Sequence, residues 1–135
     1  ISLLEDADTF ISSCAGKAYL AIVTDGPSAS QNNKIDRLGL RDRVDEVIAT
    51  ADFGTDWHKP SPASFQHLQS VFNISPTSCV YYGDNPRKDF QGPRELGWQT
   101  VRVRRVGGLH YDFVESGEAD RVVPDFKGET LAGLG

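Results

Sequence analysis

The chain contains no methionine, only two cysteines and no apolar run long enough to span a membrane. A chain that begins at Ile1 without any methionine is expected to be part of a longer protein or the product of processing. No signal peptide is recognisable. The cysteines, Cys14 and Cys79, lie in apolar segments and offer no second pair for a metal site. We therefore expect two buried free thiols in a reducing, cytoplasmic compartment.

Long blocks of like charge are also missing. The formal net charge of −5 argues against nucleic acid as a non-specific partner, and no segment indicates a membrane partner. A small basic cluster of Arg102, Arg104 and Arg105 is expected to face solvent. With 135 residues, of which 39% are hydrophobic, the chain is long enough for one domain with a real core.

What the sequence does contain is a regular alternation of helical and extended patterns. The apolar spacing predicts helices from Leu4 to Cys14, Gly26 to Leu38, Ser61 to Phe72 and Arg87 to Leu96. Short apolar runs predict strands at Tyr19 to Val23, Val44 to Ala49, Cys79 to Tyr82, Gln99 to Val103 and, as an edge, Arg121 to Val123. A last helical turn is expected between Gly128 and Leu134. This order indicates βαβ units and an α/β fold with a parallel sheet.

The third of these helices has its own buried stripe. Ser61 and Pro62 are typical of a helix start, and Phe65, Leu68, Val71 and Phe72 recur at helical spacing behind them. We expect that stripe to face the core.

Polar residues follow three of the expected strands. Thr24-Asp25-Gly26 follows the first, Lys59-Pro60 follows the second after a short loop, and Gly83-Asp84 with Asp89 follows the third. Carboxyl ends of parallel strands are where α/β proteins bind ligands. A hydroxyl and backbone N–H groups bind phosphate oxygens, a lysine neutralises a transferring phosphoryl group, and two carboxylates position Mg²⁺.

Each of these residues also has a purely structural interpretation. Thr24 would cap a helix, Asp25 would occupy a turn and Lys59 would be an exposed cation. Asp89 would be an acid favoured in the first turn of a helix. Four such residues at strand ends, in this order, favour one shared site for phosphate and magnesium.

These motifs resemble those of the haloacid dehalogenase-like (HAD) hydrolases, over roughly Phe10 to Val103. Leu20 to Gly26 is similar to the family's second motif, which usually ends Thr-Asn-Gly. Lys59-Pro60-Ser61-Pro62 with Phe65 is similar to the third motif. Gly83-Asp84 with Asp89, followed by Gly92, Leu96-Gly97 and Thr100-Val101, is similar to the fourth.

The resemblance implies a Rossmann-like three-layer sandwich with a mostly parallel sheet and a Mg²⁺-dependent phosphohydrolase activity on a small phosphorylated substrate. It implies that Thr24 and the backbone at Asp25 bind the phosphoryl group, and that Lys59 stabilises charge on the nucleophile and the phosphate. Asp84 would ligate Mg²⁺, and Asp89 would complete or orient this acidic pair. Asp25 stands where the family commonly has asparagine, so its extra charge is acceptable only if the side chain turns away.

The first family motif is missing. The family attacks phosphorus with the first aspartate of an Asp-x-Asp pattern at the end of a strand, and nothing before Thr24 fits. Asp6-Ala7-Asp8 has the spacing but lies within a helical pattern. The missing strand would lie between those ending at Thr24 and Tyr82, which predicts a gap in the sheet.

We therefore expect residues 1–135 to be a partial core domain without a cap, because the interval from Thr24 to Lys59 is too short for one. A homo-oligomer or an upstream domain of the same parent chain would cover the gap. One alternative is a non-catalytic HAD-like module for binding or scaffolding. Another is a phosphoacceptor receiver domain, but there the acidic residues come first in the chain and Lys-Pro last.

Overall fold

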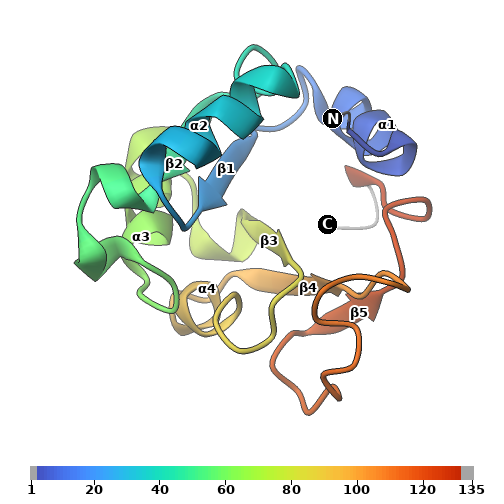
Figure 1. Ribbon diagram of the computed structural model, residues 1–135. Coiled ribbons are helices and arrows are strands. Elements are labelled where there is room, and N and C mark those ends of the chain that lie inside the picture. The colour runs from blue at the N-terminus through green and yellow to red at the C-terminus, as the bar shows by residue number, and fades with distance from the viewer. Residues whose placement is uncertain (1–2, 132–135) are drawn as a thin grey trace.

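The computed structural model describes residues 3–131. Its helices are α1 (Glu5–Cys14), α2 (Ser28–Arg37), α3 (Ala63–Phe72) and α4 (Gln91–Glu95), and its strands are β1 (Ala21–Thr24), β2 (Glu46–Ala49), β3 (Val80–Gly83), β4 (Gln99–Val103) and β5 (Arg121–Val123) (Figure 1). Short 3-10 turns occupy 50–52, 55–57 and 76–78. None of the helices within 3–131 has the length and apolar character needed to cross a membrane.

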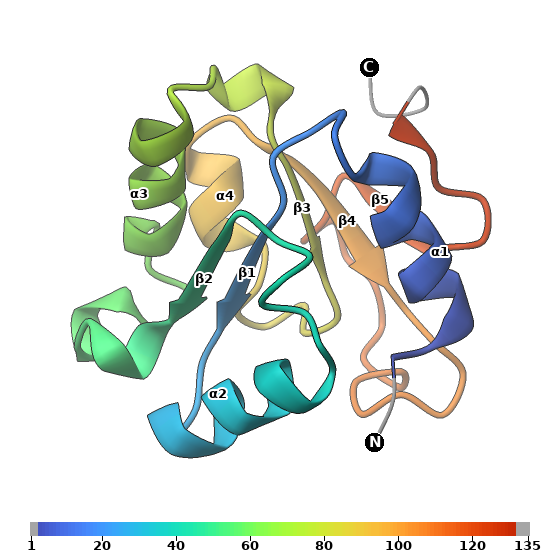
Figure 2. The same ribbon diagram turned by 90° about the horizontal axis from the view of Figure 1, so that it is seen from above.

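The strands form two separate parallel sheets. β1 pairs with β2, and β3, β4 and β5 pair in that order. Between residues 3 and 131, β1 makes no strand pairing with β3, so a break separates the two sheets (Figure 2). The break lies where the sequence predicts a gap, between the strands that end near Thr24 and Tyr82. The parallel strands with helices around them confirm the predicted α/β, Rossmann-like architecture.

Helix α3 covers one face of both sheets. Phe65 and Leu68 of α3 pack with Ile48 of β2 and with Trp98, and Tyr81 of β3 lies against the same cluster. Burying a side chain of this size stabilises a fold by about 1.5 to 3 kcal/mol, so this cluster holds the two sheets together across the break. The predicted stripe is wrong at Val71, which is 49% exposed because it lies on the outer side of the helix.

Helix α1 packs against the opposite face of β3. Phe10 lies edge-on to Tyr82 at 5.3 Å between ring centroids, and it stacks on Phe126 of the C-terminal segment at 5.4 Å. Successive side chains of a strand point to opposite faces, which explains why Tyr81 meets α3 while Tyr82 meets α1. Arg105 ties the helix down with an ion pair to Asp6 at 2.7 Å.

Two predicted helices differ from the structure. The helix expected from Arg87 to Leu96 is only α4, Gln91–Glu95. Pro93 explains the shortening, because its missing N–H is tolerated in the first turn but would break a helix that began at Arg87. Of the turn expected at Gly128 to Leu134, only Leu131 is described as helical, and the residues after it lie outside the described range. Cys14 is buried as predicted, whereas Cys79 is only half-buried; both thiols are free.

The long segment between β4 and β5 is organised by Arg102. This residue of β4 is 1% exposed, so its prediction as a solvent-facing arginine is wrong. Its guanidinium donates to the carbonyl oxygens of His110 and Phe113 and pairs with Glu115 at 3.1 Å. The sequence does not predict how this segment is organised, because the three partners of Arg102 lie eight to thirteen residues further along, in a stretch without helical or strand pattern.

Replacing Arg102 with leucine is expected to destabilise the protein by about 3 kcal/mol, because Glu115 and two carbonyl groups lose a buried cation. Urea unfolding followed by circular dichroism measures this. The matched control is Arg37→Leu, which removes an exposed guanidinium from α2 and is expected to cost no more than about 0.5 kcal/mol. Equal losses in the two variants would contradict the clamping role.

Candidate functional site

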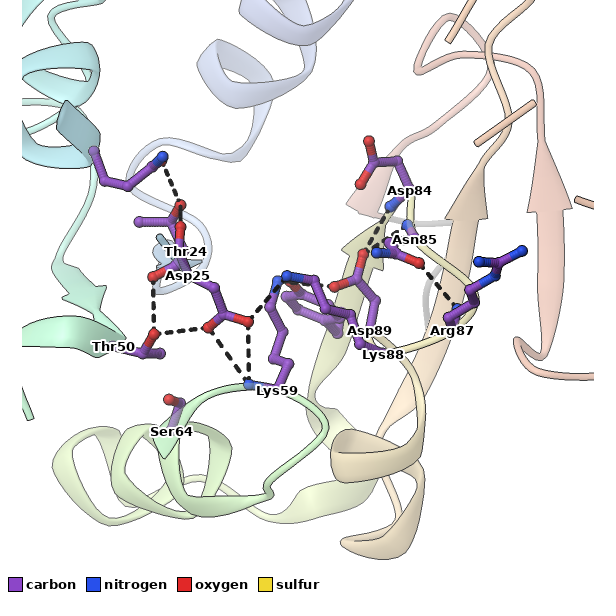
Figure 3. A network of polar contacts seen from close by, with 12 residues as sticks. Thr24, Asp25, Thr50, Lys59, Ser64, Asp84, Asn85, Arg87, Lys88 and Asp89 are labelled. Atoms are coloured by element: carbon purple, nitrogen blue, oxygen red, sulfur yellow. Dashed lines mark hydrogen bonds and ion pairs between the residues drawn. The ribbon is translucent and has the colours of Figure 1, made fainter. Parts of the chain in front are cut away.

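The polar residues that follow the strands lie at one edge of the molecule. Asp25 directly follows β1, Lys59 lies between β2 and α3, and Asp84 and Asp89 follow β3. Because the strands are parallel, their carboxyl ends meet on the same side, across the break. A continuous network of hydrogen bonds and ion pairs joins Asp25, after β1, through Lys59 to Asp89 and Asp84, after β3 (Figure 3).

The Asp25 carboxylate is turned toward protein donors. It accepts hydrogen bonds from the Thr50 hydroxyl at 2.7 Å and from the Lys59 backbone N–H at 3.2 Å, and it pairs with the Lys88 ammonium at 3.1 Å. Burial alone would raise the pKa of Asp25, but the hydrogen bonds from Thr50 and Lys88, with the charges of Lys59 and Lys88, outweigh it and hold this pKa below its usual value. The negative charge of Asp25, at a position where asparagine is expected, is therefore compensated by these donors and cations.

Lys59 is the buried centre of the network. Its side chain is 8% exposed, and its ammonium pairs with Asp89 Oδ1 at 2.8 Å and donates to the Tyr81 hydroxyl at 3.0 Å. Burial raises the pKa of Tyr81 to about 12, so the phenol is neutral and accepts. Burial alone would lower the pKa of Lys59, but the Tyr81 oxygen and the Asp89 carboxylate outweigh it and raise the pKa above its usual value.

Asp89 fixes the turn that follows β3. Its Oδ2 accepts the backbone N–H groups of Asp84 at 3.0 Å and Asn85 at 2.8 Å. Gly83 permits this close approach, since a Cβ at that position would lie 2.6 Å from Asp89 Oδ2. Oδ2 of Asp89 is thus occupied by the turn, whereas the buried Oδ1 faces Lys59 as an ion pair and accepts no hydrogen bond within residues 3–131. Of its two expected roles, completing the acidic pair or orienting it, these contacts favour orienting it.

Thr24 and Asp84 stand at the two ends of the network and do not converge on its centre. The Thr24 hydroxyl donates to Gln31 Oε1 at 2.8 Å. The Asp84 carboxylate is exposed and points away from the Lys59–Asp89 pair (Figure 3). It lines a separate cavity of about 110 Å³ beside Arg104 and His110. The structure therefore brings Asp25, Lys59 and Asp89 together and leaves Thr24 and Asp84 directed elsewhere.

Sequence reasoning missed four members of the network: Gln31, Thr50, Tyr81 and Lys88. One signal was available for Lys88. A carboxylate at position 25, where the resemblance predicts an amide, indicates that a cation lies nearby. Nothing in the pattern around Thr50 or Gln31 distinguishes them from ordinary polar residues.

Asp84 is the residue that fits a magnesium ion. Its carboxylate makes no hydrogen bond or ion pair with any residue in 3–131, while its backbone is fixed by Asp89. Mg²⁺ in proteins is commonly held by one or two carboxylates together with waters and substrate phosphates. Within the described residues no three acidic, histidine or cysteine side chains gather, so the remaining ligands would come from water, phosphate or residues outside this set.

A family model described as haloacid dehalogenase-like hydrolase matches residues 1–97. The chain belongs to this family. The predicted resemblance is thereby confirmed. The match ends shortly before β4, so it includes the segments that carry Thr24, Lys59, Asp84 and Asp89.

The curated relatives of this HAD chain include proteins named as phosphatases. Glyceraldehyde 3-phosphate phosphatase of Methanopyrus kandleri is 34% identical over 108 residues, which cover 80% of this chain and 44% of the relative. Phosphoserine phosphatase of Thermus thermophilus is 30% identical over 104 residues, which cover 76% of this chain and 41% of the relative. The chain therefore spans less than half the length of these relatives.

Solved structures of HAD proteins share the fold. A HAD phosphatase from Thermococcus onnurineus superposes with a TM-score of 0.77 at 26% identity, over 98% of this chain and 56% of that one. CbbY from Rhodobacter sphaeroides, solved in complex with phosphate, gives a TM-score of 0.81 at 20% identity, over 98% of this chain and 59% of that one. The likeness to CbbY concerns the fold alone.

Replacing Lys59 with methionine is expected to destabilise the HAD chain by about 3 kcal/mol, because the buried Asp89 carboxylate loses its cation. The double variant Lys59→Met/Asp89→Asn is expected to lose less than the sum of the two single variants. Chemical denaturation measures both, with Lys34→Met on exposed α2 as the matched control. Strict additivity of the two single variants would show that the ion pair contributes nothing.

The pKa of Asp25 is expected to rise in Lys88→Gln, because that variant removes a hydrogen bond and a charge that lower it. The contribution of Asp25 to stability is present above its unfolded-state pKa of about 3.9. That contribution is lost as pH falls through the lower folded-state pKa. Carboxyl ¹³C NMR titration measures the shift, and an Asp25 pKa unchanged from wild type would argue that the two groups do not interact in solution.

Proposed function

We propose that this HAD chain is the carboxyl-terminal part of the core of a Mg²⁺-dependent phosphohydrolase that acts on a small phosphate ester. The observation that carries the proposal is the break between β1 and β3, with a charged network at its carboxyl end. A strand that filled the break and ended in aspartate would bring a nucleophile beside Lys59. Residues 1–135 are then a partial core domain without a cap, and the family's nucleophile lies outside them.

Each polar residue has a distinct role in this proposal. Lys59 stabilises negative charge on the nucleophile and the phosphoryl group, and Thr24 with the backbone at Asp25 binds phosphoryl oxygens. Asp84 would hold Mg²⁺, with Asp89 orienting it through the Asp84 and Asn85 N–H groups. When bound, the magnesium ion supplies charge neutralisation for the transferring phosphoryl group. The upstream aspartate attacks phosphorus, the leaving oxygen is protonated and departs as the alcohol, and water then hydrolyses the aspartyl-phosphate to release inorganic phosphate.

The substrate class follows from the relatives. Those named above as phosphatases of glyceraldehyde 3-phosphate and phosphoserine act on small phosphate monoesters, which supports a substrate of that size for the whole protein. The proposal assigns to none of the residues 3–131 a role in selecting one such ester over another.

A second candidate function is a non-catalytic HAD-like module for binding or scaffolding. The observation in its favour is that the Thr24 hydroxyl and the Asp84 carboxylate point away from Lys59. The two candidates differ in one respect. In the phosphohydrolase, a strand ending in Asp-x-Asp precedes this segment of the parent protein, and in the binding module no such pattern precedes it.

The purified 135-residue chain is expected to show no hydrolysis of p-nitrophenyl phosphate, because it lacks the nucleophile. A longer protein that includes the preceding strand is expected to hydrolyse this ester only with Mg²⁺. Asp84→Asn is expected to reduce the turnover of that longer protein by about a thousandfold. Magnesium-dependent turnover by the 135-residue chain would refute the prediction that the nucleophile lies outside it. A longer protein that is saturated with magnesium but inactive would favour the binding module.

A further inference from the structure

The ion pair between Asp25 and Lys88 crosses the break in the sheet. Asp25 follows β1 and Lys88 lies in the turn after β3, and their side chains meet at 3.1 Å. The Asp25 side chain is 11% exposed, whereas that of Lys88 is 39% exposed. The ammonium of Lys88 therefore lies at the surface of the network while its anionic partner is held inside it.

The two lysines of the network differ in what their ammonium groups have left to donate. An ammonium has three N–H donors. That of Lys59 already contacts Tyr81 and Asp89 and is nearly enclosed. That of Lys88 contacts only Asp25 among residues 3–131, so two of its donors remain free for an incoming oxyanion.

The charges of the network support a linked role for Asp25 and Lys88. The family's usual asparagine at position 25 would leave Lys59 and Asp89 as a neutral pair. Asp25 adds one negative charge beside the phosphoryl site, and Lys88 adds one positive charge 3.1 Å away. The sum of charges is thereby unchanged, but the network gains a partly exposed cation on its outer side.

We propose that Lys88 is a second phosphate-binding cation of this site and that Asp25 is the positioning residue that holds it at the carboxyl end of the break. This rests on the proposed function, since it assumes that the phosphoryl group binds between the ends of β1 and β3. Phosphate oxygens take the two free donors of Lys88 while its third stays on Asp25. Lys59 neutralises the same anion from the buried side.

Phosphate binding to the 135-residue chain tests the assignment. Inorganic phosphate is titrated in the presence of MgCl₂, and the backbone amide signals of Asp25, Gly26 and Lys88 are followed by ¹H–¹⁵N NMR. Lys88→Gln is expected to weaken binding about tenfold, which is the loss of one charge-assisted contact. Lys88→Arg, which keeps the charge, is expected to remain within about threefold of wild type. The matched control is Lys34→Gln, which removes an exposed lysine of α2 and should leave the affinity unchanged.

The role of Asp25 is tested by a double-mutant cycle. Asp25→Asn/Lys88→Gln restores the sum of charges and is expected to bind phosphate more tightly than Lys88→Gln alone. If the double variant binds as weakly as Lys88→Gln, Asp25 does not position or compensate Lys88, and that part of the proposal is overturned. If Lys88→Gln binds as tightly as Lys34→Gln, the assignment of Lys88 is overturned while the proposed function stands. If the wild-type chain gives no response to phosphate, the phosphoryl site itself is rejected, and the assignment with it.

Discussion

The buried ion pair between Lys59 and Asp89 is the interaction on which the carboxyl end of this fold depends. Lys59 belongs to the segment after β2 and Asp89 to the turn after β3, so the pair links the two sheets that have no strand pairing between them within 3–131. Removing two charges from water is costly, and additional hydrogen bonds to the pair reduce this cost. Here Lys59 also donates to the Tyr81 hydroxyl, and Asp89 Oδ2 accepts the N–H groups of Asp84 and Asn85, whereas the buried Asp89 Oδ1 has only the ion pair within 3–131. The same contact therefore joins the sheets and sets the backbone from which Asp84 projects.

The break is bridged in two chemically different ways. On the face of α3, apolar side chains from both sheets share one cluster around Phe65. At the carboxyl ends, charges from both sheets share one network around Lys59. Neither bridge supplies backbone hydrogen bonds to the facing edges of β1 and β3, and an unpaired strand edge is a template for another strand. This is the physical reason for placing the family's missing strand in the break rather than at an outer edge of either sheet.

Much of the fold could be predicted from the sequence because its signals are local. Continuous apolar runs gave β2 and β4 within a few residues, and the patterns for α1 and α3 ended where the helices end. The length of α4 depended on where Pro93 falls within its helix, which periodicity alone does not reveal. Arg102 was misassigned because its burial depends on carbonyl groups of a distant, patternless loop. Tertiary packing decides which groups contact Arg102, and the residues next to Arg102 in the sequence do not reveal them.

The site shows the same division between local and distant information. The strand-end positions of Asp25, Lys59 and Asp84 were readable because a strand followed by a polar turn is a local pattern. Their side-chain directions were not, since Thr24 is drawn to Gln31 and Asp25 to Lys88, which lies 63 residues further along the chain. The aspartate at position 25, where the family commonly has asparagine, can be explained only together with Lys88. Taken alone, Asp25 opposes an anionic ligand; paired with Lys88, it holds a cation where that ligand would bind. A residue that departs from its family's motif is therefore better interpreted together with its nearest opposite charge than by itself.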